Sequence, residues 1–313
     1  MEKRPLKNTS LELSAVGMGG AHIQKNQVYA YGARVSEAAS IEAVHFAIDS
    51  GINFIDTAPL YSDSEEVLGR AMEGRRHQVV LSTKVGCFRG INDDSRDGAW
   101  RSIEQSLSRL KTDHVEILFL HSLQDDQPWI DLLGGDKILA AMLDAREQGV
   151  ARYLGVSGTK PRPLIEAMQS GLFDVAMTYY EYNLLRRGAL PVLREAERLK
   201  MGLINAGPLN GGLLNGDRSG EMDDRRQRRL DPALADRIEK LVDLCRDHDY
   251  SSPQLNLRFS LAAPFASTVL GMRNRVEVQA ALDAVERPPP ESLWTAALQL
   301  IETPSDIGVP TNA

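Results

Sequence analysis

The sequence predicts an α/β fold in the form of a (β/α)₈ TIM barrel, and three observations lead to this prediction. Short runs rich in β-branched and other apolar residues alternate with segments of helical periodicity along the 313 residues. Polar residues follow several of these runs at the point where each run ends. No Pro/Gly/Ser-rich linker divides the chain. We therefore expect a single domain over residues 1–313, with the barrel at 14–287 and a C-terminal extension at 288–313.

The expected elements alternate in chain order. The strands are expected at residues 15–19, 53–56, 79–84, 115–121, 151–157, 174–179, 202–206 and 267–271. The helices are expected between them, at residues 36–50, 64–74, 95–110, 136–148, 161–170, 188–199 and 232–247. Gly51, Gly149 and Gly171 stand where three of these helices end, the usual place for a left-handed residue. Glu65 and Glu66 stand in the first turn of the second helix, at the positive end of its dipole.

A doubly wound sheet is the competing fold. It normally carries a G-x-G-x-x-G fingerprint between its first strand and first helix, whereas residues 17–21 here (GMGGA) lead into a polar loop. Two segments interrupt the alternation, a long loop at residues 205–231 and the tail at 288–313. The loop contains the charge run 223–229, which is either a solvated surface or a flap over the barrel mouth.

Composition excludes several classes of protein. The net charge of −7 and the pI near 5.5 disfavour a nucleic-acid partner, which requires a basic face. Cys87 and Cys245 are too few and too scattered for a disulfide framework or a zinc site. Residues 1–10 lack the apolar segment of a secretory signal, and no apolar run approaches the roughly 18 residues that span a bilayer. We expect a cytoplasmic protein without a membrane partner, as a monomer or a small homo-oligomer.

Four polar residues stand at or just beyond the ends of expected strands. Asp56 ends the second strand, and Tyr61 follows it in the next loop. Lys84 ends the third strand and His121 ends the fourth. The carboxyl ends of parallel barrel strands converge on one mouth, where barrel enzymes build their active sites. The sequence therefore predicts that these four side chains form a site.

The four groups suit proton transfer to or from a carbonyl oxygen. A free tyrosine has a pKa of about 10, and a neighbouring lysine ammonium favours the phenolate. An aspartate paired with the lysine holds that cation in place, and a histidine can hydrogen-bond the substrate oxygen. Because no side chain donates hydride, the reaction requires a nicotinamide or a flavin. The set predicts an oxidoreductase that acts on a carbonyl compound or an alcohol.

Several segments in the same order resemble the aldo-keto reductase family. They are residues 53–61 (NFIDTAPLY), 82–86 (STKVG), 118–121 (LFLH), 154–157 (LGVS), 182–185 (YNLL) and 208–214 (PLNGGLL). The resemblance runs from about Leu6 to Ile301 and implies a barrel with an N-terminal hairpin, which residues 6–13 would form. It also implies that Tyr61 is the general acid/base, that Lys84 and Asp56 tune it, and that His121 orients the carbonyl.

The resemblance further implies a nicotinamide cofactor that lies extended across the barrel mouth. Its expected contacts are Gly19, Gly20, Ser157, Gly158, Tyr179, Ala206, Pro208, Leu209, Gly271, Met272, Arg273 and Glu277. Three positions depart from the family pattern. Gly158 replaces an asparagine, Thr178 or Tyr179 lies near the place of a glutamine, and Ala206 replaces an aromatic residue.

Cofactor choice is expected to depend on Glu277. Members that prefer NADPH have a basic residue near this position, and a carboxylate repels a 2′-phosphate but accepts a hydrogen bond from a ribose hydroxyl. Arg273 and Arg275 remain able to pair with a phosphate. NAD is therefore favoured over NADP. Residues 269–272 (VLGM) resemble the sugar-oxidising branch of the family, which includes the L-galactose, L-fucose and D-threo-aldose dehydrogenases.

The substrate is expected to be a sugar or a small carbonyl compound. His22 in the first loop and Trp129 after the fourth strand are candidates to bind it. The alternative for His22 is an exposed loop position, and the alternative for Trp129 is a packing role. Oxidation of an aldose to a lactone is the leading hypothesis. The alternatives are an NADPH-dependent aldehyde or ketone reductase and a non-catalytic nicotinamide-binding regulatory subunit.

Overall fold

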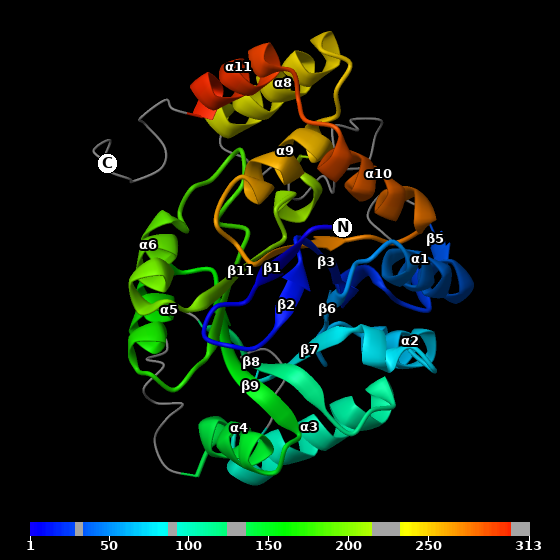
Figure 1. Ribbon diagram of the computed structural model, residues 1–313, viewed down its shortest axis with the longest axis vertical. Coiled ribbons are helices and arrows are strands. Elements are labelled where there is room, and N and C mark those ends of the chain that lie inside the picture. The colour runs from blue at the N-terminus through cyan, green and yellow to red at the C-terminus, as the bar shows by residue number, and fades with distance from the viewer. Residues whose placement is uncertain (29–33, 87–92, 124–135, 215–231, 302–313) are drawn as a thin grey trace.

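The computed structural model describes residues 1–28, 34–86, 93–123, 136–214 and 232–301. Its centre is a closed barrel of parallel strands in the order β10-β11-β12-β3-β6-β7-β8-β9 (Figure 1). These strands are β3 (Val16–Gly19), β6 (Phe54–Asp56), β7 (Val80–Val85), β8 (Val115–Leu123), β9 (Ala151–Gly158), β10 (Val175–Tyr179), β11 (Gly202–Ala206) and β12 (Ser267–Gly271). The predicted (β/α)₈ barrel is confirmed, and every predicted strand lies within two residues of an observed one at both ends.

Helices surround the barrel. They are α1 (Glu37–Asp49), α2 (Ser64–Ala71), α3 (Arg96–Leu110), α4 (Ile138–Glu147), α5 (Pro161–Gln169), α6 (Leu190–Leu199), α8 (Pro232–Asp247), α9 (Ser252–Leu261), α10 (Arg275–Glu286) and α11 (Glu291–Ile301). Short 3₁₀ turns are η1 (Gly20–His22), η2 (Arg76–Gln78) and η4 (Asn210–Gly212). Ser36, Ser95 and Asn274 begin α1, α3 and α10, and each side chain accepts a backbone N–H of the first turn.

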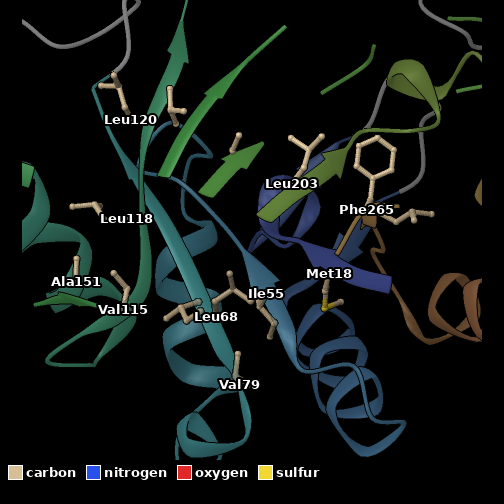
Figure 2. Packing of buried hydrophobic residues seen from close by; sticks show 14 of the residues in the cluster. Met18, Ile55, Leu68, Val79, Val115, Leu118, Leu120, Ala151, Leu203 and Phe265 are labelled. Atoms are coloured by element: carbon tan, nitrogen blue, oxygen red, sulfur yellow. The ribbon is translucent and has the colours of Figure 1, made fainter. Parts of the chain in front are cut away.

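Alternate residues of each barrel strand face the interior and the helices. Met18 and Ile55, for example, belong to the apolar layer between strands and helices, part of which Figure 2 shows. Their neighbour Phe54 faces the interior, as does Phe119 on β8. Both rings are fully buried, and they lie against glycines on other strands, Gly17 and Gly155. Large and small residues thus alternate across the interior and fill it.

An antiparallel hairpin closes the amino end of the barrel. It consists of β1 (Lys3–Pro5) and β2 (Glu12–Ser14), so the strands flank the expected segment 6–13 and most of that segment forms the turn. Leu6 and Leu13 are fully buried in the interior cluster, and Leu6 lies over Gly202 at the start of β11. The opposite end, where the strands finish, is left for a site. A second hairpin, β4 (Asn26–Val28) with β5 (Arg34–Ser36), precedes α1.

The segment between β11 and β12 differs from the expectation. The predicted helix at 232–247 is present as α8, but it packs on α11 outside the ring of helices (Figure 1). The helix that covers β12 is α9, which the sequence did not predict. The expected C-terminal extension contributes α11 to this outer layer. None of the helices in the described ranges has the length and hydrophobicity to span a membrane.

Gly155 gives a test of the interior packing. A Cβ atom on Gly155 would lie 2.4 Å from the Phe119 ring, whereas one on Gly158 of the same strand would meet Leu123 at an ordinary 3.5 Å. We expect Gly155→Ala to lower the free energy of unfolding by about 1–3 kcal/mol, because the overpacked ring must shift. Gly158→Ala is the matched control and should leave stability nearly unchanged. Equal stability of the two variants in urea unfolding would contradict this account.

Candidate active site

The carboxyl ends of the strands form a mouth whose two halves differ in chemistry. By the period of two, the last inward-facing residues are Gly19, Asp56, Lys84, His121, Ser157, Tyr179, Ala206 and Gly271, one from each barrel strand. The neighbouring strands β6, β7 and β8 contribute Asp56, Lys84 and His121. The neighbouring strands β11, β12 and β3 contribute Ala206, Gly271 and Gly19. The strand ends of one half are therefore polar, whereas those of the other carry almost no side chains of their own.

Asp56 and Lys84 form a buried ion pair at the centre of the polar half. Lys84 Nζ lies 2.6 Å from Asp56 Oδ2, and both side chains are at most 5% exposed. Ser82 Oγ donates to the other carboxylate oxygen at 2.7 Å, and Lys84 Nζ also donates to the Thr57 carbonyl at 2.7 Å. The desolvation of two charges is thus offset by their pairing and by further hydrogen bonds.

Tyr61 lies in the loop that leads from β6 to α2, and its ring lies near two of the other predicted residues. The ring centroid is 5.0 Å from Lys84 Nζ. The centroids of Tyr61 and His121 are 5.8 Å apart, with the rings nearly perpendicular. The four residues predicted from strand ends therefore come together in one cluster.

His121 is uncharged over the range in which most enzymes work. It is 8% exposed, and burial, together with the Lys84 charge, lowers its pKa to about 3. A neutral imidazole can hydrogen-bond a substrate oxygen, but at neutral pH it does not bring a second positive charge beside Lys84.

The bare half of the mouth suits a flat ligand. Gly19 and Ala206 leave the ends of β3 and β11 free of long side chains. Gly20 begins η1 in a confined space, where a Cβ atom would lie 2.7 Å from Ser64 Oγ and 3.0 Å from the Asp56 carbonyl oxygen. Glycine at this position therefore lets the backbone pack closely on Ser64 and Asp56. These residues would hold a nicotinamide dinucleotide, which would supply hydride chemistry at the mouth.

Hydroxyl groups line the boundary between the two halves. Ser157 Oγ donates to the Leu120 carbonyl at 3.1 Å and accepts from the Ser122 N–H at 3.0 Å. Ser122 Oγ in turn lies 2.6 Å from the Tyr179 hydroxyl. Burial raises the pKa of Tyr179, so the phenol stays protonated and can donate. Sequence reasoning missed Ser122, although it directly follows His121.

The backbone is strained at this boundary. Ser122 and Tyr180, which follow the mouth positions of β8 and β10, both adopt left-handed conformations, with φ of 66° and 65°. Such values are uncommon for residues other than glycine and are often found at functional sites. The Tyr180 ring packs on Gly207, beside Pro208 and Leu209. The Pro208 carbonyl accepts from Asn256 of α9 at 2.8 Å, which fixes the turn after β11.

Glu277 does not present an isolated carboxylate. It lies in the first turn of α10, and one of its oxygens accepts the Arg273 backbone N–H at 2.8 Å. The other accepts Arg273 Nε at 2.6 Å. The feature at this end of the predicted cofactor site is therefore an Arg273–Glu277 pair that follows the buried Met272. Arg275 stacks on Phe46, with Cζ 3.7 Å from the ring centroid.

His22, a predicted substrate residue, lies with the predicted cofactor residues. A Cβ atom on Gly271 would lie 2.5 Å from His22 Nδ1, so the imidazole covers the end of β12. Burial and the Arg273 charge lower the pKa of His22, and Glu277 opposes them. Trp129, the other predicted substrate residue, lies outside the described residues, as does the charge run at 223–229.

The buried His121 should make stability depend on pH. In the unfolded chain its pKa is close to 6.5, whereas in the folded chain it is about 3, so acid protonates the unfolded state first. Its contribution to stability is complete above pH 6.5 and is lost as the pH falls towards 3. We expect His121→Gln to make this decline shallower by up to about 1.4 kcal/mol per pH unit in urea unfolding. Above pH 7 both proteins should show the same slope, and equal slopes at pH 4–6 would contradict the prediction.

Comparison with known proteins agrees with this geometry. The model of the Aldo/keto reductase family matches residues 15–300. L-galactose dehydrogenase of Arabidopsis thaliana is 30% identical over 297 residues, which cover 91% of this chain and 88% of that protein. D-threo-aldose 1-dehydrogenase of a Pseudomonas species is 26% identical over 94% of this chain and 96% of its own.

A solved structure is similar throughout. The holo form of an aldo-keto reductase from Bacillus halodurans superposes with a TM-score of 0.74 and 25% identity, covering 96% of both chains. The family match extends over nearly the whole barrel, and the cluster at its mouth contains an aspartate, a tyrosine, a lysine and a histidine. The chain therefore belongs to the aldo/keto reductase family, a family of oxidoreductases.

Proposed function

We propose that the protein is an NAD(P)-dependent oxidoreductase with Tyr61 as its general acid/base, and that its foremost reaction is the oxidation of an aldose to a lactone. One observation carries the proposal. Lys84 of the buried Lys84–Asp56 pair lies over the Tyr61 ring, and the ring of a neutral His121 lies nearly perpendicular to that ring. A regulatory subunit that only binds nicotinamide has no need of this complete set, so the set favours catalysis.

The roles of the residues follow from their charges. In the oxidation, the Tyr61 phenolate accepts the proton of the sugar hydroxyl, and the Lys84 ammonium stabilises the phenolate until then. The Asp56 carboxylate holds the ammonium in position through its 2.6 Å contact. The neutral His121 holds the substrate oxygen by a hydrogen bond. A bound nicotinamide supplies the acceptor for the hydride. In the reduction the same groups act in reverse.

The relatives and the mouth support a polyhydroxyl substrate. Two relatives that cover about nine tenths of the chain or more are named as sugar dehydrogenases, for L-galactose and for D-threo-aldoses. The Ser122 and Tyr179 hydroxyls lie next to the cluster and can hydrogen-bond the hydroxyl groups of a sugar. An NADPH-dependent aldehyde or ketone reductase is the second candidate, because Arg273 stands at the predicted cofactor end and can pair with a phosphate.

Replacement of Tyr61 by phenylalanine tests the proposed function. Tyr61→Phe keeps the ring that packs on Lys84 and His121 but removes the proton-transferring hydroxyl. We expect kcat for aldose oxidation to fall by about 10²–10⁴-fold, the usual contribution of a general acid or base. Dinucleotide affinity, measured by isothermal titration calorimetry, should stay within a factor of two to three. Tyr153→Phe is the control, because it makes the same chemical change at the amino end of the barrel, where the Tyr153 hydroxyl bonds Ser10, and should keep the wild-type kcat. A variant Tyr61→Phe with wild-type kcat would refute the assignment.

Replacement of Glu277 tests the choice of cofactor. We expect the wild type to bind NAD⁺ more tightly than NADP⁺, because the Glu277 carboxylate engages Arg273 and repels a 2′-phosphate. Glu277→Gln should increase NADP⁺ affinity about tenfold, equivalent to about 1.4 kcal/mol, with little effect on NAD⁺. Glu286→Gln makes the same charge change at the exposed end of α10 and should alter neither affinity. Tighter NADP⁺ binding by the wild type would instead favour the reductase.

A further inference from the structure

The backbone carbonyl of Thr57 is a second anchor for the Lys84 ammonium. Lys84 Nζ donates to it at 2.7 Å, a contact nearly as short as the one of 2.6 Å to Asp56. An ammonium group has three protons, and Asp56 and Thr57 take two of them. Lys84 Nζ also lies 5.0 Å from the centroid of the Tyr61 ring. The direction of the third proton relative to Tyr61 is therefore set by where these two acceptors stand. Asp56 is held by Ser82, so the position of the Thr57 carbonyl is the remaining variable.

The Thr57 side chain is fixed by a hydrogen-bond relay of known polarity. Ser64 Oγ lies 2.6 Å from the Gly20 carbonyl oxygen, which can only accept, so the Ser64 hydroxyl donates there. Ser64 then has no proton left for Thr57, whose Oγ1 is 2.9 Å away. Thr57 must be the donor in that contact. The relay runs from Thr57 to Ser64 and on to Gly20.

Burial makes this relay specific. Thr57 and Ser64 are both 0% exposed, so water does not substitute for either partner. The Thr57 N–H donates to the Ser82 carbonyl at 2.9 Å, which fixes the other side of the residue. Gly20 also packs closely against the Thr57 side chain, since a Cβ atom on Gly20 would lie 2.9 Å from Thr57 Oγ1. Every polar atom of Thr57 is thereby engaged, and its carbonyl has one orientation.

We propose that Thr57 and Ser64 are positioning residues that hold the Lys84 ammonium towards Tyr61, and that Gly20 is the fixed end of their relay. This inference rests on the proposed function in one respect, the role of Tyr61 as the acid/base. It adds two residues to the site and joins the loop of the predicted cofactor residue Gly20 to the ammonium through hydrogen bonds.

Breaking the relay should raise the pH at which Tyr61 ionises. Without the Ser64 acceptor the Thr57 peptide can turn, and the ammonium then follows its carbonyl away from the phenol. A phenolate with a less favourably placed cation is less stable, so Tyr61 ionises at higher pH. We expect the loss of one buried hydrogen bond to raise the titration midpoint of Tyr61 by about half a pH unit to one unit. For alcohol oxidation, which needs the phenolate, the pH profile of kcat moves upward by the same amount.

The test is a titration of Tyr61 itself. Tyrosinate absorbance is recorded against pH for wild type and for Thr57→Val, and the curve of the corresponding Tyr61→Phe protein is subtracted from each. Thr57→Val keeps the branched shape and removes the hydroxyl. Thr57→Ser keeps the hydroxyl and should titrate like the wild type. Thr268→Val is the matched control, because Thr268 is also fully buried and bonds a serine hydroxyl, that of Ser260, at 2.9 Å.

A higher titration midpoint of Tyr61 in Thr57→Val, but not in Thr268→Val, supports the relay. A wild-type midpoint in Thr57→Val, or an equal move in Thr268→Val, would overturn it. If Thr57→Val does not fold, Ser64→Ala breaks the same hydrogen bond by removing its acceptor and is judged by the same criterion. The readout does not depend on turnover. A protein inactive towards all aldoses and carbonyl compounds would refute the proposed function, while the titration would still decide the inference.

Discussion

The buried pair of Lys84 and Asp56 is the interaction on which the site depends. Removing two charges from water costs several kcal/mol for each ion, so the pair persists only because its geometry is held closely. That geometry comes from the register of β6 and β7, which places Asp56 opposite Ser82. The adjoining loop then supplies the Thr57 carbonyl. Parallel pairing within a closed barrel therefore does more than enclose a core, because it fixes the distance between two charges.

The amino end of the barrel provides the rigidity that this register needs. Interior aromatic side chains such as Phe119 pack against glycines, and Leu6 of the hairpin packs into the amino end of the barrel. Arg4 of the hairpin donates to the carbonyls of Leu261 and Phe265, at 3.0 and 3.2 Å. These hydrogen bonds link the hairpin to the end of α9 and the turn that follows it. Because the amino end of the barrel is closely packed, the mouth is the end where polar groups can contact a ligand. Stability and chemistry are thereby separated along the barrel axis.

The sequence allowed the barrel strands and the cluster of Asp56, Lys84 and His121 to be predicted, because the period of two places strand-end residues on one side. It did not reveal α9, and the reason is chemical. The buried face of α9 carries Ser252, Asn256 and Ser260 at intervals of four residues. Each of them hydrogen-bonds a neighbouring element, so the helix packs against the barrel with a polar stripe. A search for apolar periodicity passes over such a helix.

The Arg273–Glu277 pair shows why residue types alone do not settle cofactor choice. A spacing of four residues is typical of an ion pair on a helix, whereas the residue types taken singly predict one group that repels a phosphate and one that attracts it. Joined, they are nearly neutral as a unit, and their effect depends on which partner a ligand displaces. An incoming 2′-phosphate can pair with Arg273 only if the Arg273–Glu277 ion pair breaks, whereas a ribose hydroxyl can donate a hydrogen bond to the carboxylate while the pair stays intact. This asymmetry is the physical basis of the proposed preference for NAD⁺.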